Sequence, residues 1–142
     1  MPLTHVLAPF DLEAASRPAL EYAADLVGPE GTVTVVHVMT VLSIETPTAL
    51  HETRPLEQEA EDRAMAALTE ATEALSGRAR FLTEAVFGDP VTEILRAARD
   101  ADAEAIVIEV KNRSRLGKLL MGSKAQSIIL QAHCPVICVP KD

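Results

Sequence analysis

A group of basic residues late in the chain is the strongest candidate for chemistry. The 142-residue chain has a net charge of −8, yet five of its 13 Lys and Arg residues lie between positions 111 and 124, namely Lys111, Arg113, Arg115, Lys118 and Lys124. An apolar run at 105–108 precedes them and an amphipathic run at 123–132 follows. This order predicts a strand, a basic loop and the start of a helix. Because a helix N-terminus presents unpaired N–H groups and a positive dipole end, the segment could bind a small anion.

Glycine content argues against an ordinary phosphate loop in this segment. Such loops usually need several glycines, because the backbone must approach the ligand closely, and only Gly117 and Gly122 are present. The alternative is that the basic side chains form a solvated loop that pairs with acidic neighbours.

Other catalytic patterns are missing from the sequence. The four histidines have no spacing typical of a metal site, so we predict no metal. The chain has no G-x-S-x-G elbow, no G-x-x-x-x-G-K-[ST] loop and no G-x-G-x-x-G turn after its first strand. We therefore predict no catalytic residue.

Composition limits the class of protein. The length suits one domain over residues 1–142, and a hydrophobic content of 48% with only 3% aromatic residues suits helices packed on a buried sheet. The acidic net charge and the scarcity of aromatic residues disfavour nucleic acid and membranes as partners. No apolar run is long enough to span a membrane and no export signal begins the chain, so we expect a cytoplasmic protein. Cys134 and Cys138 are then expected as small buried thiols without a disulfide.

Strands and helices alternate along the sequence. Alternating or continuous apolar patterns predict strands at 5–10, 32–39, 80–87, 105–110 and 135–140, and helical spacing predicts helices at 16–27, 55–75, 90–101 and 123–132. Asp89 and Pro90 are suited to the start of the third helix. This alternation predicts an α/β domain with an open five-stranded parallel sheet, helices on both faces and the strand order 3-2-1-4-5 of a Rossmann-like fold. The ligand crevice of such a sheet would lie between 9–13 and 109–123.

Four separated segments resemble the universal stress protein family. VLAPFD, VTVVHV, GDPVTEILRAA and HCPVICVP are similar to that family's first strand, second strand, turn into the third helix and closing strand, in the right order. The resemblance runs nearly end to end and implies the adenine nucleotide alpha-hydrolase-like fold. It also implies a role in stress response or regulation, in some members with ATP bound.

The nucleotide motif of this family is degenerate here. The motif is Gly, two residues, Gly, nine residues, Gly and then Ser or Thr, and its end matches Gly122 and Ser123. Counting back places Glu109 and Asn112 at the two earlier glycines. A side chain at either position would occupy ligand space, and the carboxylate of Glu109 would also repel a polyphosphate.

The resemblance implies candidate residues for both binding and assembly. Residues matching nucleoside contacts or the phosphate-side loop are Pro9, Asp11, Val38, Glu109, Lys111, Asn112, Arg113, Gly122, Ser123 and Lys124. Family members commonly dimerise through the last strand, which implies a homodimer interface at Val136, Ile137 and Val139.

Two functional hypotheses follow. In the first, the chain is a dimeric regulator that contacts an unknown protein partner, has no efficient catalysis and has a crevice partly blocked by Glu109. In the second, ATP with magnesium, or another phosphorylated small molecule, binds at 111–118 and the helix start at Gly122 and Ser123, with at most slow hydrolysis. A weaker alternative is a sensor of small anions.

Overall fold

The computed structural model describes residues 3–12, 17–40, 53–111 and 121–141. Over these residues the elements alternate as expected: β1 (His5–Pro9), α1 (Arg17–Val27), β2 (Thr32–Met39), α2 (Thr53–Glu73), β3 (Arg80–Phe87), α3 (Pro90–Asp100), β4 (Ala105–Lys111), α4 (Ser123–Gln131) and β5 (Val136–Lys141). The predicted bounds agree with these to within two residues at each end. At β4, the strand continues one residue beyond the predicted end, to Lys111, and Glu109 lies within it as predicted.

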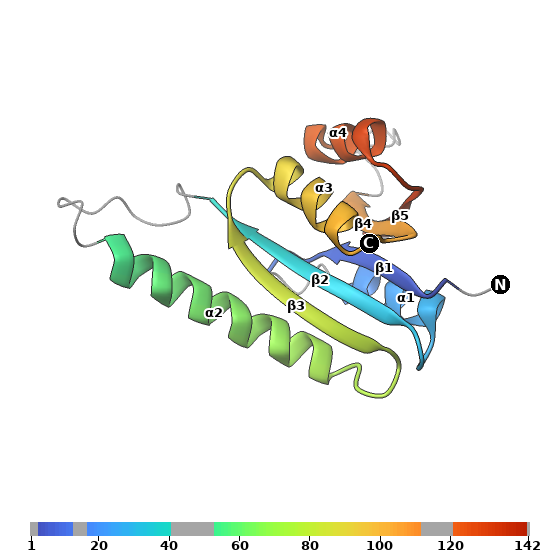
Figure 1. Ribbon diagram of the computed structural model, residues 1–142, viewed down its shortest axis with the longest axis horizontal. Helices are drawn as coiled ribbons and strands as arrows, with labels where there is room; N and C mark the ends of the chain where they lie inside the picture. The colour runs from blue at the N-terminus through green and yellow to red at the C-terminus, as the bar shows by residue number, and fades with distance from the viewer. Residues whose placement is uncertain (1–2, 13–16, 41–52, 112–120, 142) are drawn as a thin grey trace.

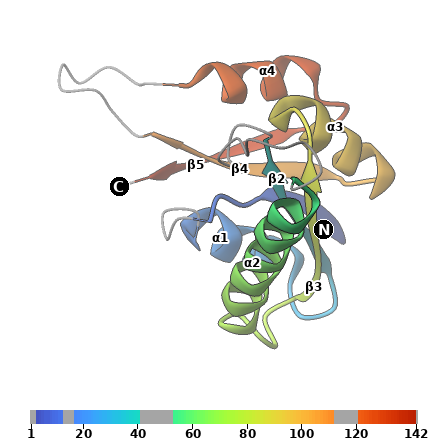
Figure 2. The ribbon, with the colours of Figure 1, turned by 90° about the vertical axis from the view of Figure 1, so that its left-hand side faces the viewer.

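The sheet has the predicted strand order. Its five strands run β3-β2-β1-β4-β5, and every neighbouring pair is parallel. Figures 1 and 2 show α1 and α2 on one face of the sheet and α3 and α4 on the other. The predicted α/β architecture with helices on both faces is therefore confirmed.

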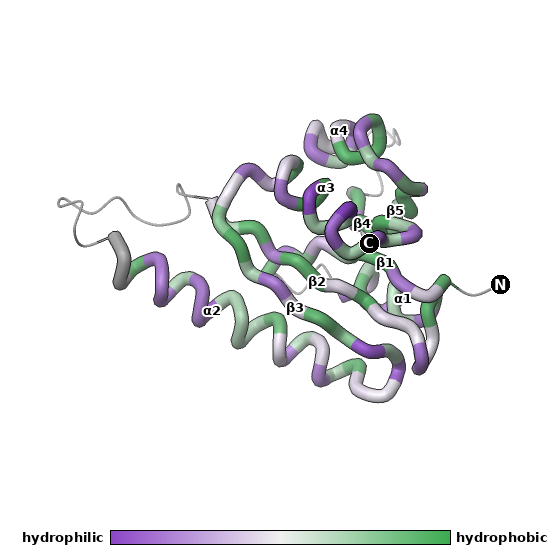
Figure 3. The backbone as a smooth tube through the Cα atoms, in the orientation of Figure 1, coloured by the Kyte–Doolittle hydropathy of each residue, from purple (hydrophilic) through white to green (hydrophobic). Residues whose placement is uncertain are grey.

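Strand alternation divides the core into two layers. In β1, Val6 and Ala8 pack towards α1 and α2, whereas Leu7 packs towards α3 and α4. Hydrophobic residues follow the central strands, and hydrophilic residues are frequent along α2 (Figure 3). The central strands β1 and β4 are thus buried on both faces, as expected of a parallel sheet between helical layers. The carboxyl ends of β1 and β4, where the candidate residues lie, therefore follow strands that are packed on both faces.

Candidate functional site

The end of β1 is attached to β2 by two hydrogen bonds. The backbone N–H of Phe10 donates to the Val36 carbonyl at 2.8 Å, and Nδ1 of His37 lies 2.8 Å from the Phe10 carbonyl, so this ring nitrogen donates to it. Phe10 is buried, whereas Asp11 is exposed directly after it. The position from which the chain leaves β1 towards α1 is therefore fixed by His37 and by the backbone of β2.

The end of β2 is the second part of the candidate site, and it is bonded to the turn that follows β3. Val38 is half-buried and packs against the layer under α3 and α4. One residue later, the Met39 carbonyl accepts a 2.9 Å hydrogen bond from the N–H of Gly88, which ties β2 to the turn before α3. Pro9 is also half-buried. Two candidate nucleoside-contacting residues, Pro9 and Val38, thus lie at the ends of adjacent parallel strands.

Asp89 begins α3 as predicted from the sequence. Its Oδ2 accepts hydrogen bonds from the Thr92 N–H at 3.0 Å and from the Thr92 hydroxyl at 2.9 Å. These bonds, together with the charge of Lys124, lower the pKa of the Asp89 carboxyl below its usual value. α3 and α4 lie side by side over the same face of the sheet (Figures 1 and 2), and Lys124 is on the first turn of α4.

Glu109 lies within β4, in agreement with the strand predicted at 105–110. It pairs with Val139 of β5, and strand alternation places it on the same face of the sheet as Ala105 and Val107, which pack towards α1. The residue is half-buried and its Oε2 atom is fully buried. The backbone at the first motif glycine is therefore extended β-strand, with an acidic side chain on the α1 side of the sheet.

The start of α4 resembles a phosphate-binding helix end in its backbone. Gly122 is the N-cap with φ −67° and ψ 162°, and no side chain caps the helix. Its carbonyl accepts from the N–H of Gln126 at 3.1 Å, and the side chain of Gln126 donates to the Met121 carbonyl at 3.2 Å. Ser123 and Lys124 are exposed. The helix start is thus accessible, with one cation on its first turn.

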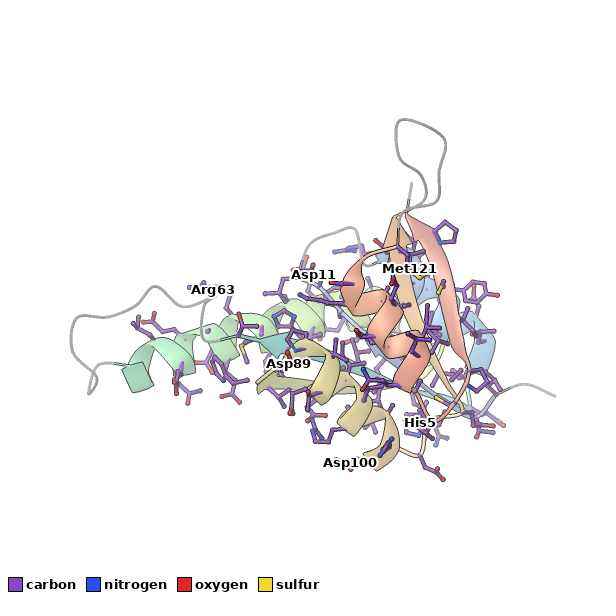
Figure 4. The ribbon with its side chains drawn as sticks, turned by 90° about the horizontal axis from the view of Figure 1, so that it is seen from above. His5, Asp11, Arg63, Asp89, Asp100 and Met121 are labelled. Atoms are coloured by element: carbon purple, nitrogen blue, oxygen red, sulfur yellow. The ribbon has the colours of Figure 1, made fainter. Side chains whose placement is uncertain are left out.

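The labelled residues of Figure 4 lie at two opposite ends of the strands. Asp11 and Met121 lie toward the end of the molecule where β4 and β5 terminate, whereas His5 lies at the opposite end. The structure therefore brings Pro9, Asp11, Val38, Glu109, Gly122, Ser123 and Lys124 to one edge of the sheet. Lys111 is the last residue of β4. The candidates Asn112 and Arg113, together with the rest of the basic segment to Lys118, lie outside the described residues.

Two features of the described residues were not predicted from the sequence. The hydrogen bond of His37 to the Phe10 carbonyl joins two strands, so the linear pattern gives no signal for it. Arg96 on α3 contacts three carboxylates, those of Glu84 at 2.7 Å, Glu93 at 2.9 Å and Asp100 at 2.9 Å. These bonds raise the pKa of the guanidinium. The spacing of Glu93, Arg96 and Asp100 on one helix was a usable signal for two of these pairs.

A model of one protein family matches nearly the whole chain. Residues 2–140 match the model of the universal stress protein family. The chain belongs to the universal stress protein family. This confirms the resemblance seen in the sequence.

Individual relatives agree with this assignment over part of their length. The chain is 39% identical over 59 residues to universal stress protein MJ0531 of Methanocaldococcus jannaschii, and 43% identical over 51 residues to a universal stress protein of Mycolicibacterium smegmatis. These matches cover 42% and 36% of this chain, and 35% and 39% of the two relatives. The chain thus aligns with well under half of the length of each relative.

Solved structures share the fold over nearly the whole chain. Hypothetical protein MJ0577, whose structure was used to assign its biochemical function, has a TM-score of 0.83 at 19% identity and covers 100% of this chain and 99% of its own. A universal stress protein from Archaeoglobus fulgidus in complex with dAMP has a TM-score of 0.59 at 23% identity, covering 97% and 98%. At these identities the likeness establishes the fold alone. Among the described residues, no helix is long and apolar enough to cross a membrane.

Proposed function

We propose that this chain is a non-catalytic regulatory member of its family, whose crevice does not bind ATP tightly. The observation that carries the proposal is the position of Glu109. It occupies the place of the first motif glycine, it is held in β4 by pairing with Val139, and its Oε2 atom is buried. A ligand phosphate at this edge would therefore approach an acidic side chain where a family member that binds ATP has no side chain at all.

Electrostatics gives the size of the effect. Two unit charges about 6 Å apart interact by roughly 3 kcal/mol at an effective dielectric constant near 20. A penalty of about 3 kcal/mol weakens binding by roughly a hundredfold. The extended backbone of β4 adds to this penalty, because the N–H groups of a paired strand are engaged with the neighbouring strand and cannot all turn towards a phosphate.

A homodimer through β5 is the second part of the proposal. β5 is an edge strand of the sheet, and its residues pack on both core layers: Val136 towards α3 and α4, and Ile137 and Val139 towards α1. All three are only half-buried. An apolar edge strand invites association unless it is covered or paired, so a second copy is the partner that this edge suits. Protein contacts by such a dimer would supply the regulatory output.

The accessible start of α4 supports one other function, the binding of a phosphorylated small molecule. The uncapped N-terminus of α4 and the exposed Lys124 favour an anion. In that case Lys111 and Arg113 would replace, with cationic side chains, the backbone donors that the missing glycines would have provided.

Two variants distinguish the functions by calorimetric titration with magnesium-ATP. The double substitution Glu109→Gly with Asn112→Gly restores both motif glycines and is expected to create or strengthen ATP binding by at least tenfold. The substitution of Lys111 and Arg113 by Ala should leave the wild-type heat unchanged. If the Lys111 and Arg113 variant instead loses saturable binding that the wild type shows, the phosphorylated-ligand function replaces the proposed one.

A further inference from the structure

A hollow of about 640 Å³ lies at the amino ends of the strands, between the residues that precede β1 and the turn from α1 to β2. Figure 4 shows His5 at this end of the molecule and Asp11 at the other, so this amino-end hollow is separate from the candidate site. Its floor is apolar, because Leu3 and Leu26 pack on the core layer under α1 and Val27 is buried in that layer. Small-molecule sites in proteins have volumes of roughly 300–1,000 Å³ and mostly apolar linings. The amino-end hollow therefore suits a small molecule in both size and lining.

The walls of the amino-end hollow are held in place by the fold itself. Gly28 follows α1 with a positive φ of 75°, which favours glycine, and its N–H donates back into the helix at 2.9 Å. A Cβ atom at Gly31 would lie 2.6 Å from the carbonyl oxygen of Val27, so a glycine is needed for the turn to pack this closely on α1. The N–H of Thr32 donates to the Thr4 carbonyl at 2.9 Å and joins the turn to the residues before β1. A ligand would therefore enter a preformed shape, which lowers the ordering cost of binding.

The polar groups of the lining favour a cation over an anion. Asp25 and Glu30 contribute two carboxylates, both exposed, and no Lys or Arg of the described residues lines the hollow. Arg78, which lies outside the lining, donates to Oδ1 of Asp25 at 2.7 Å, whereas no ion pair within the described part of the chain uses the carboxylate of Glu30. The N–H groups of Gly28 and Gly31 are already engaged within the turn. An anion would thus meet two carboxylates and few donors, while an ammonium group would find an acceptor at Glu30.

We propose that the amino-end hollow binds a small amphipathic cation, an amine whose apolar body lies on the floor and whose protonated nitrogen lies at the carboxylate of Glu30. Both features are needed for this ligand class. An apolar floor alone would accept any hydrophobic molecule, and an exposed carboxylate alone would hold a cation only weakly. The inference is independent of ATP binding at the crevice, because none of the candidate site residues lines the hollow.

The test is a titration of the full, isotope-labelled chain, followed through its backbone N–H signals by nuclear magnetic resonance, with probes that share one apolar body. The probes are 4-phenylbutylamine, the neutral 4-phenylbutan-1-ol and the anionic 4-phenylbutanoate. The amine should shift the signals of Leu26, Glu30 and Gly31 and should saturate in the millimolar range, as expected for a ligand of this size. The alcohol should bind roughly threefold more weakly, and the butanoate should not saturate. Butylamine, which lacks the phenyl ring, should not saturate either, because it leaves the apolar floor uncovered.

Charge changes at Glu30 separate binding in the hollow from a general attraction of amines to an acidic protein. Glu30→Gln should abolish the preference for the amine over the alcohol, and Glu30→Lys should make the butanoate the tightest of the probes. Glu59→Gln on α2, which removes another exposed carboxylate, is the matched control and should leave every affinity unchanged. Far-ultraviolet circular dichroism and the melting temperature check that the variants are folded.

Several outcomes would overturn the proposal. They are equal binding of the amine, the alcohol and the butanoate, an unchanged preference in Glu30→Lys, signal shifts confined to residues outside the lining, and no saturation with the amine up to about ten millimolar. A short peptide with adjacent lysine and phenylalanine that binds more than roughly a hundredfold more tightly than the amine would identify a protein segment as the occupant, and would also overturn it. The proposed function stands or falls separately, by titration of ATP at the crevice.

Discussion

Truncation of Leu68 in α2 tests how much the core layer under α1 and α2 contributes to the free energy of unfolding. Its side chain is fully buried, with 0% exposure, in the core layer that also contains Val33 and Val35 of β2. Leu130 of α4 is 83% exposed. The two residues have the same chemistry and both lie in helices, so Leu68→Ala and Leu130→Ala differ mainly in burial.

The magnitude follows from the cavity that truncation would leave. Replacing a fully buried Leu by Ala typically lowers the free energy of unfolding by about 3 kcal/mol, within a range of roughly 2–5. Helix propensity changes little, because Ala and Leu are both good helix formers. For a domain of this size, about 3 kcal/mol corresponds to a decrease in melting temperature of roughly 9 °C. Leu130→Ala should stay within about 0.5 kcal/mol of the wild type.

The assay is urea unfolding followed by circular dichroism, at one fixed protein concentration because association would add to the apparent stability. With an m-value of about 2 kcal/mol per molar urea, Leu68→Ala should shift the midpoint by roughly 1.5 M. Equal shifts for the two variants, or a change of less than about 1 kcal/mol for Leu68→Ala, would refute the assignment of α2 to the core layer.

Two further predictions concern assembly and pH. Ile137→Lys adds a charge to the edge strand β5 and should convert a dimer to a monomer in light scattering. The control is Leu82→Lys on the opposite edge strand β3, where Leu82 is 57% exposed, and it should leave the mass unchanged. A monomeric wild type would contradict the interface. The pKa of Asp89 is lowered mainly by hydrogen bonds from Thr92, and that of Glu104 by bonds from Thr4 and the His5 N–H. A carboxyl whose pKa is lower in the folded chain stabilises it above the unfolded pKa of about 4, and this contribution is lost as the pH falls through the folded value. Asp89→Asn should therefore flatten the decrease in unfolding free energy below about pH 4, measured by urea unfolding across pH, and an unchanged acid slope would count against the Asp89 contacts.

Much of the fold could be predicted from local chemistry. Continuous β-branched runs such as Thr32–Met39 specify buried parallel strands, and the Asp89-Pro90 pair marks the start of α3 at the observed residue. The strand order 3-2-1-4-5, predicted from the alternation of strands and helices as that of a Rossmann-like sheet, is confirmed.

The candidate site was less predictable, because its geometry depends on contacts between distant segments. The sequence identifies Glu109 as a departure from the motif within a predicted strand, but only the structure shows that it pairs with Val139 of β5 and that its Oε2 atom is buried. Likewise, the contact of His37 with Phe10 and that of Arg96 with Glu84 join different elements. No periodicity within one element encodes such contacts.

The most direct measurement is a calorimetric titration of the wild-type protein, stripped of nucleotide, with magnesium-ATP, using inorganic phosphate as a control. If Glu109 closes the crevice to polyphosphates, no saturable heat should appear up to millimolar ATP. Saturable binding in the micromolar range would contradict this, and would show that cations of the basic segment compensate for the lost glycines.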